Sequence, residues 1–344
     1  MPIEASSADP RPRRALRLAF GSAACLAASY GLALPISFLP PLLTLLLLAA
    51  RNQPLPLKAC LALALLAALT TGGGLLLIPL LRYYPASGVL LVALCLFLCF
   101  HHGLYGGNPL VSTFLIIGLT LVSATGSRDV AAALAVIEAL VMGLLLTGFA
   151  VALGHGVFPE PGGLAAPPAK PLPTPEEAAW IALRATLVVI PAFLLALIDP
   201  ASYVPLVMKS VGLGQQVCST SARDAGRELL GSTLLGGLLA IVFWWALGLF
   251  PHLWMFCLWM LLFILLVARR LYRVTATRQT PGFWLNTAAT LIILLGQSVQ
   301  DSAAGKDVYT ALAVRMGLFV AVALYACAAV YLIDRRRWRP RSAA

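Results

Sequence analysis

The sequence predicts an all-α polytopic membrane protein with about twelve transmembrane helices, arranged as two parallel six-helix repeats. Of the 344 residues, 60% are hydrophobic and 11% are charged, and the mean hydropathy is +0.92. A soluble domain usually contains about 25% charged residues, so no soluble fold of this length could bury so much apolar surface. Apolar stretches near the length of a spanning helix recur along the chain, and the basic residues gather in alternate connections.

Twelve apolar stretches are candidates for membrane-spanning helices, because about 20 apolar residues cross the hydrocarbon core. We expect them at residues 15–33, 36–50, 57–81, 86–101, 109–125, 130–155, 180–198, 202–218, 227–249, 252–268, 283–299 and 308–333. The second and eighth have the least certain boundaries. The first follows a basic segment, as in a signal peptide, but it lacks a clear cleavage pattern, so we expect an uncleaved helix.

A Pro-rich stretch at residues 158–178 divides the chain near its middle. So many prolines exclude a regular helix and indicate a semi-extended linker. The predicted organisation is a basic cytoplasmic N-terminus at 1–14, a membrane half at 15–157, the cytoplasmic linker at 158–178, a second membrane half at 179–333 and a basic cytoplasmic C-terminus at 334–344.

The basic residues indicate the orientation of the chain in the membrane. With an even number of spans and both termini inside, 19 lysines and arginines fall in the inner segments and 3 in the outer loops, at Arg82, Arg128 and Lys306. Cytoplasmic connections of membrane proteins carry this excess of positive charge. The net charge of +11 is therefore explained by orientation in a membrane, and we expect no nucleic-acid partner.

The two halves resemble each other in sequence. Five short matches occur in the same order, and the clearest opens the last span of each half. There, residues 128–136 (Arg-Asp-Val, then Ala-Leu-Ala-Val) match residues 306–314 (Lys-Asp-Val, then Ala-Leu-Ala-Val), with a constant offset of 311 − 133 = 178. Six spans in each half make the repeats parallel, and transporters with internal repeats bind substrate between them, near the middle of the membrane.

Three ionisable residues lie well inside predicted spans, away from the span ends, where charge is costly and indicates function: Glu138, Lys209 and Arg315. Glu138 and Arg315 should each lie about 12–13 Å along a helix that enters from the outside. They occupy adjacent repeat positions, because 315 − 178 = 137, and they could face each other between the halves. They would then form either a structural ion pair or a transport site in which Glu138 carries protons and Arg315 binds a substrate carboxylate.

Lys209 lies in the middle of the eighth predicted span. Gly212, Gly214, Gln215 and Gln216 follow it, which indicates an irregular or broken helix that lines a polar cavity. The alternative is a helix that ends early and leaves Lys209 near the cytoplasmic surface. Two weaker candidates, Arg17 and Arg184, open equivalent helices and should anchor them at that surface, unless they serve in gating. Asp129, Asp301 and Asp307 should be solvated helix caps in the outer loops.

The sequence contains no motif for ATP hydrolysis or metallohydrolase chemistry, because Walker A, HExxH, GxSxG and Asp-rich metal motifs are all absent. Seven scattered cysteines include no CxxC pair, so we interpret them as small apolar residues. His101 and His102 follow Cys95 and Cys99, but an interfacial position explains them better than a metal site. We therefore expect no enzyme activity, no cofactor and no metal.

The chain resembles the fusaric-acid-resistance and aromatic-carboxylic-acid exporter superfamily. The resemblance rests on Ala-Leu-Arg opening each half, Phe-Leu-Pro or Tyr-Val-Pro opening the short second helices, the Gly226–Gly237 segment, and Arg315 in a last helix of the form DVYTALAVRMGLFVAVAL. Long members carry a sizeable cytoplasmic domain, which this compact chain lacks. The resemblance implies proton-coupled efflux of organic acids across a bacterial inner membrane, with a periplasmic adaptor of the membrane-fusion type.

The sequence thus favours a secondary efflux permease that binds a small organic anion between its halves. Arg315 and Lys209 would hold the anion, and Glu138 would couple transport to protons. One alternative is a non-transporting scaffold or subunit of an envelope complex. Another is an intramembrane enzyme acting on lipid, for which the sequence offers no nucleophile or metal cluster. A homo-oligomer is compatible with each of these interpretations.

Overall fold

The computed structural model describes residues 9–51, 53, 55–159, 173–217 and 226–337. The described residues contain helices and connections but no β-strand, as the sequence predicts. Nine of the described helices are long and apolar enough to cross a membrane. The chain is therefore a multi-pass helical protein in contact with lipid.

The first half begins with α1 (Pro10–Gly31) and the short α2 (Leu39–Ala50). A bent rod follows, made of α3 (Leu57–Gly72), the 3₁₀ segment η1 (Gly73–Leu77) and α4 (Ile78–Tyr83). Next come α5 (Pro85–Leu104) and a second interrupted rod, made of α6 (Pro109–Ile117), the π-helical segment η2 (Gly118–Val122) and α7 (Ser123–Arg128). The half ends with α8 (Val130–Val157).

The second half contains α9 (Pro175–Ile198), α10 (Pro200–Val217), the π-helical segment η3 (Gly226–Leu230), α12 (Gly231–Leu249), α13 (Leu253–Leu271), α14 (Pro281–Ala303) and α15 (Val308–Arg337). Each of the twelve predicted stretches overlaps one of these helical rods. The helix α9 begins four residues before the predicted second half, because Thr174 and Glu177 form a capping box with Pro175 at the first helical position.

One expectation about local structure was wrong, and one predicted span contains a shorter helix than expected. The described α10 is a continuous helix through Gly212 and Gly214, so it is not broken at the glycines. Gly214 instead permits close packing, since a Cβ there would lie 3.1 Å from Phe100 and Val189 side-chain atoms. The predicted second span is only the 12-residue α2, about 18 Å long, which is too short to cross a core of about 30 Å by itself.

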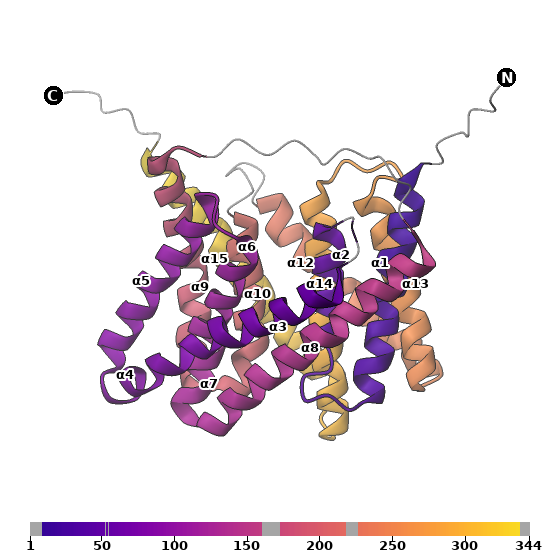
Figure 1. The fold of residues 1–344 in the computed structure, drawn as a ribbon, viewed down its shortest axis with the longest axis horizontal. Helices are drawn as coiled ribbons and strands as arrows, with labels where there is room; N and C mark the ends of the chain where they lie inside the picture. Colours follow the sequence, from indigo (N-terminus) through magenta and orange to yellow (C-terminus); the bar gives the residue numbers. More distant parts are fainter. Residues whose placement is uncertain (1–8, 52, 54, 160–172, 218–225, 338–344) are drawn as a thin grey trace.

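The halves exchange contacts reciprocally. The helix α1 packs against α13, and α9 packs against α5. Likewise, α2 packs against α14, and α10 packs against α6, η2 and α7. The N-terminal end of α1 and the C-terminal end of α15 lie on one face of the molecule, and the turn between α14 and α15 lies on the opposite face (Figure 1). The α14 helix is the most enclosed of the nine long apolar helices, and most of its side chains are buried.

Candidate functional site

Lys209 lies at the middle of α10 and is only 2% exposed. Its Nζ donates hydrogen bonds to Asn286 Oδ1 at 3.0 Å and to Thr290 Oγ1 at 2.6 Å. Asn286 and Thr290 are four residues apart, so they share one face of α14 and meet the same ammonium group. The interpretation in which α10 ends early, leaving Lys209 at the surface, is therefore wrong.

The polar contacts of Lys209 continue into α12. Asn286 Nδ2 donates to Ser232 Oγ at 2.5 Å, and Thr287 Oγ1 donates to the Ser232 carbonyl at 3.3 Å. The Ser232 hydroxyl donates to the Glu228 carbonyl one turn earlier, and the Glu228 carboxylate accepts from the Thr280 hydroxyl. We call Lys209, Asn286, Thr290, Ser232 and Glu228 the lysine cluster; it links α10, α14 and the start of α12.

A glycine allows α12 to approach α14 at this cluster. A Cβ added to Gly236 would lie 2.7 Å from Thr290 Cβ and 2.8 Å from the Thr287 carbonyl oxygen, closer than real Cβ atoms come. The Gly-Gly pair in this part of the sequence therefore has a local reason. It lets the backbone of α12 lie against the face of α14 that carries the partners of Lys209.

The charge of Lys209 is balanced by no carboxylate in the described part of the chain. Both of its described partners are neutral oxygens, while an ammonium group has three hydrogens to donate. Burial of an uncompensated charge is expensive, and a membrane-embedded lysine ordinarily pairs with an anion or faces a polar cavity. The arrangement can thus accept one more hydrogen-bond acceptor, and an anionic one would be favoured.

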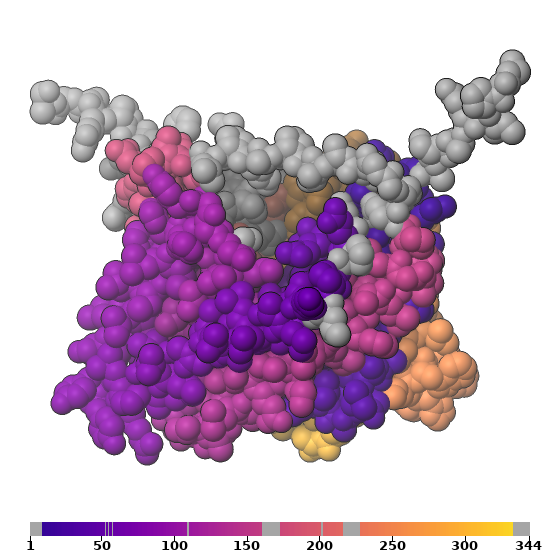
Figure 2. All heavy atoms as spheres, viewed as in Figure 1, coloured from indigo at the N-terminus to yellow at the C-terminus, as the bar shows by residue number. Residues whose placement is uncertain are grey.

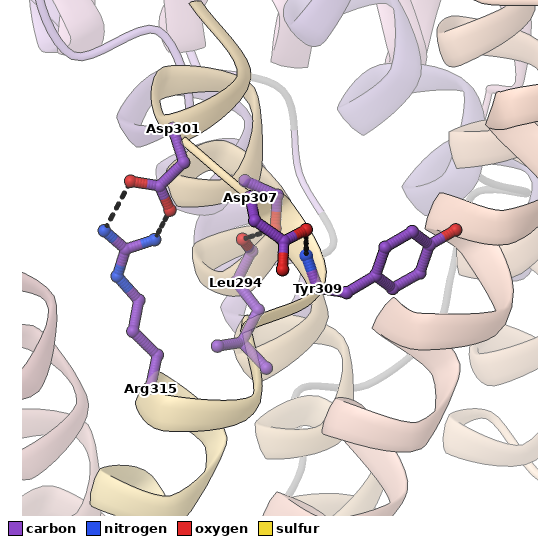
Figure 3. A network of polar contacts seen from close by, with 6 residues as sticks. Leu294, Asp301, Asp307, Tyr309 and Arg315 are labelled. Atoms are coloured by element: carbon purple, nitrogen blue, oxygen red, sulfur yellow. Dashed lines mark hydrogen bonds and ion pairs between the residues drawn. The ribbon is translucent and has the colours of Figure 1, made fainter. Parts of the chain in front are cut away.

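A second charged site joins the last two helices near the turn that connects them. The two terminal guanidinium nitrogens of Arg315, Nη1 and Nη2, donate to the two carboxylate oxygens of Asp301, and the Nη2–Oδ1 distance is 3.0 Å (Figure 3). The side chains are 18% and 5% exposed, so the pair is largely buried. The expected pairing of Arg315 with Glu138 was wrong, because α15 directs Arg315 back toward α14.

Glu138 lies on the outer surface of α8, away from both charged sites. It is exposed and forms no described hydrogen bond or ion pair. Leu134, Met142 and Phe149 lie near it on the helix and are 52%, 47% and 67% exposed, so Glu138 interrupts an apolar surface stripe. The three ionisable residues found in the sequence therefore occupy three separate environments.

The weaker candidates also occupy different environments. Gln215 Nε2 donates to Thr113 Oγ1 at 2.9 Å, which links α10 to α6 across the two halves. The side chain of Gln216 lies outside the described residues. Arg17 and Arg184 are 1% and 7% exposed, so both side chains are buried in helix packing, and their role as anchors at the cytoplasmic surface stays a prediction. A Cβ on Gly154 of α8 would lie 3.2 Å from Arg17 Cγ.

Two of the three expected aspartate caps are found. Asp129 caps α8 by accepting from the Ala131 amide at 2.9 Å, and Asp307 caps α15 by accepting from the Tyr309 and Thr310 amides at 3.3 and 3.2 Å (Figure 3). The third expectation was wrong: Asp301 lies within α14 and binds Arg315. Within the described residues, no group of three metal-binding side chains occurs.

Sequence reasoning missed the partners of the charged residues: Asp301, Asn286, Thr290, Ser232 and Glu228. Asn286 lies within the predicted span at 283–299, and Asp301 lies just beyond it. Polar residues at such positions need partners, and this requirement is the signal that could have identified them. The pairing of Lys209 with α14, 77 residues away for Asn286 and 81 for Thr290, depends on tertiary packing that local patterns do not specify.

The fold and its buried polar contacts define a multi-pass α-helical membrane protein. Residues 14–153, which run from α1 into α8, match the model of a family described as "Protein of unknown function (DUF2955)". The match covers most of the first half and none of the second. No curated protein and no solved structure gives a significant match to the chain.

Proposed function

We propose that this protein is a secondary efflux permease that exports small organic anions, in the first instance aromatic carboxylic acids, across a bacterial inner membrane. The observation that carries the proposal is the ammonium group of Lys209, which is buried in the middle of α10 with two neutral described partners. A substrate carboxylate would supply the missing counter-charge. It would compete with Asn286 and Thr290 for the ammonium hydrogens.

The surroundings of Lys209 suit a site that opens alternately to the two sides. The residue is 2% exposed, so a substrate would reach it only after α10 moves relative to α14. The same α10 contacts the first half through Gln215 and Thr113. Reciprocal packing of α1 with α13 and of α9 with α5 supports two structural repeats that rock about their interface.

For proton coupling we propose two carboxylates, Asp301 and Glu138. Protonation of Asp301 would release Arg315, which could then hold a second substrate oxygen or alter the packing of α14 against α15. The alternative coupling group is Glu138, a carboxylate that would be protonated and deprotonated at the exposed surface of α8. Comparing Asp301→Asn with Glu138→Gln separates these roles, since only the coupling group should abolish the dependence of export on the proton gradient.

The rest of the proposal concerns cellular context. Positive-inside bias supports twelve spans with both termini cytoplasmic. The resemblance to the fusaric-acid-resistance superfamily supports a periplasmic adaptor of the membrane-fusion type. We propose no enzyme activity, cofactor or metal.

The central experiment compares Lys209→Met with Lys306→Met, the same substitution in the turn after α14. A strain lacking the gene is complemented with each variant and exposed to fusaric acid, salicylate and 4-hydroxybenzoate, with membrane abundance measured by immunoblot. We expect Lys306→Met to restore resistance and Lys209→Met to fail while remaining in the membrane. Full resistance with Lys209→Met would overturn the proposal.

A scaffold without transport activity is the second candidate, and the outward position of Glu138 is the observation that favours it. A carboxylate on an apolar, exposed stripe would be stabilised by a cationic residue of a membrane partner or of a second copy. Under this hypothesis Glu138→Leu would change the size of the detergent-solubilised complex, and Lys209→Met would leave both the complex and resistance unchanged.

A further inference from the structure

A cavity of about 330 Å³ lies between α12, α13 and the connection from α13 to α14. Its apolar part is formed by Leu235 and Leu239 of α12 and by Phe263, Leu266 and Val267 of α13. Its polar part is formed by Arg269, Arg270 and Thr275 beside Trp284. Leu266 is 51% exposed, so the apolar part opens toward the surface that lipid covers.

The basic groups at the cavity have no described counter-ion. Arg269 and Arg270 are exposed residues at the C-terminal end of α13, and within the described chain neither guanidinium takes part in a hydrogen bond or an ion pair. The Arg270 guanidinium lies over the Trp284 ring, with its carbon 5.0 Å from the ring centroid. This cation–π contact occupies one face of the group and leaves its N–H edges available to an anion.

A buried hydroxyl lies at the same place. The Thr275 Oγ1 is inaccessible to solvent and has no hydrogen-bond partner among the described residues. Its backbone is fixed, because the Val274 and Thr275 amides donate to the Arg269 carbonyl at 2.8 and 3.2 Å and Arg273 adopts a left-handed conformation at φ 56°. Buried hydroxyls are almost always satisfied. Thr275 lines the cavity together with Arg269 and Arg270, so an acceptor bound there would satisfy its hydroxyl once the threonine side chain rotates toward the cavity.

We propose that this cavity binds an anionic phospholipid. The phosphate would accept hydrogen bonds from Arg269, Arg270 and Thr275, and an acyl chain would lie along Leu235, Leu239 and Leu266. The cavity has the two-part character that this ligand requires, with basic donors at one end and an apolar channel at the other. The α13–α14 connection lies on the same face as the N-terminal end of α1 (Figure 1), so the lipid belongs to the leaflet on that side.

The test measures lipid retained by the purified full-length protein in mild detergent, using native mass spectrometry. Phosphatidylglycerol and cardiolipin are compared with phosphatidylcholine, and inorganic phosphate and glycerol 3-phosphate serve as soluble anions. Arg269→Gln/Arg270→Gln is compared with Arg278→Gln, an exposed arginine of the same connection that does not line the cavity. Thr275→Val is the second variant, and it leaves the charge unchanged.

We expect the protein to retain the two anionic lipids and not phosphatidylcholine. Each arginine should contribute about 1 kcal/mol, which is a little over fivefold in affinity, so the double variant should weaken lipid retention about thirtyfold. The Arg278→Gln variant should retain nearly as much lipid as the unchanged protein. Thr275→Val should also weaken it, even if the double variant fails to fold. Equal retention by Thr275→Val and Arg278→Gln, or binding of the soluble anions as tight as that of lipid, would overturn the proposal.

Discussion

The fifth helical rod of the first half, made of α6, η2 and α7, and the fifth helix of the second half, α14, have similar places in the fold. Their polar side chains form different kinds of contact. In the first half, the Thr120 and Thr125 hydroxyls of η2 and α7 donate to carbonyls one turn back, at 2.7 and 2.8 Å. In the second half, α14 directs Asn286, Thr290 and Asp301 toward other helices, where they meet Lys209 and Arg315. The Thr120 and Thr125 hydroxyls are satisfied within their own rod, whereas α14 holds the partners of two charged side chains.

This difference separates polar residues that need no partner from another helix from those that do. Serine and threonine can bond within their own helix, so they enter a membrane core at little cost and need no partner. A buried lysine or arginine requires a partner from another element. The described partners of Lys209 and Arg315 therefore lie on α14, and the hydroxyls of η2 and α7 supply a neutral counterpart against which substitutions can be compared.

The largest expected effect comes from the buried Arg315–Asp301 ion pair of the second half. Arg315→Met should lower the free energy of unfolding by about 3–5 kcal/mol, because it leaves Asp301 buried without its partner. Unfolding in SDS or by heat, measured on protein in mild detergent, checks this. Arg82→Met, at an exposed arginine, is the matched control. The double variant Asp301→Leu/Arg315→Met should recover much of the loss, and a stability equal to that of Arg82→Met would contradict a structural role.

The next effect compares the glycine pairs of the two halves. A Cβ at Gly74 would lie 2.0 Å from the Gly118 carbonyl oxygen, which belongs to the backbone, whereas a Cβ at Gly237 would meet the flexible Met316 side chain. We expect Gly74→Ala to lower the free energy of unfolding by about 1–3 kcal/mol. Gly237→Ala should lower it by much less, because the Met316 side chain can move. Thermal unfolding in detergent distinguishes them, and equal losses would show that Met316 is as rigid as the η2 backbone.

A smaller effect compares hydroxyls of the two halves. Ser232→Ala should cost about 1–3 kcal/mol, because it leaves the partly buried Asn286 Nδ2 without its described acceptor. Thr147→Val removes bonds to Thr44 and to the Pro40 carbonyl and should cost about 1 kcal/mol. Chemical unfolding curves of both variants provide the measurement, and a Thr147→Val loss above that of Ser232→Ala would reverse the comparison.

The smallest effect depends on pH and concerns the cap of α15. A hydrogen bond from the Thr310 hydroxyl, then bonds from the Thr310 and Tyr309 amides, lower the pKa of Asp307. Its stabilisation is therefore fully present above the unfolded value of about 4 and is lost as the pH falls through the lower folded value. The difference in melting temperature between the unchanged protein and Asp307→Ala should shrink over that fall. For the control Lys306→Ala, we expect the difference in melting temperature from the unchanged protein to stay constant as the pH falls. The same constancy for Asp307→Ala would contradict a stabilising role of the Asp307 carboxylate.

The sequence was sufficient for the positions of the helices and insufficient for the partners of their charges. Apolar runs specify where helices lie, because each run must satisfy its backbone within itself. Asp301 was predicted to be a solvated cap in the outer loop beyond the span at 283–299, yet α14 continues to Ala303 and buries that carboxylate. Lys209 was identified as buried in one of two interpretations, but its partners depend on how α10 crosses α14, which no local pattern encodes.

The proximity of Asp301 and Arg315 also bears on how the chain is assembled. The α14 helix is the least apolar of the nine candidate spans, and only a short turn separates it from the more apolar α15. Each charge alone would oppose release of its helix from the translocon into lipid. Two helices that carry opposite charges beside one turn can partition as a hairpin, so insertion of this hairpin delivers α14 to the core of the bundle together with the neighbour that neutralises it.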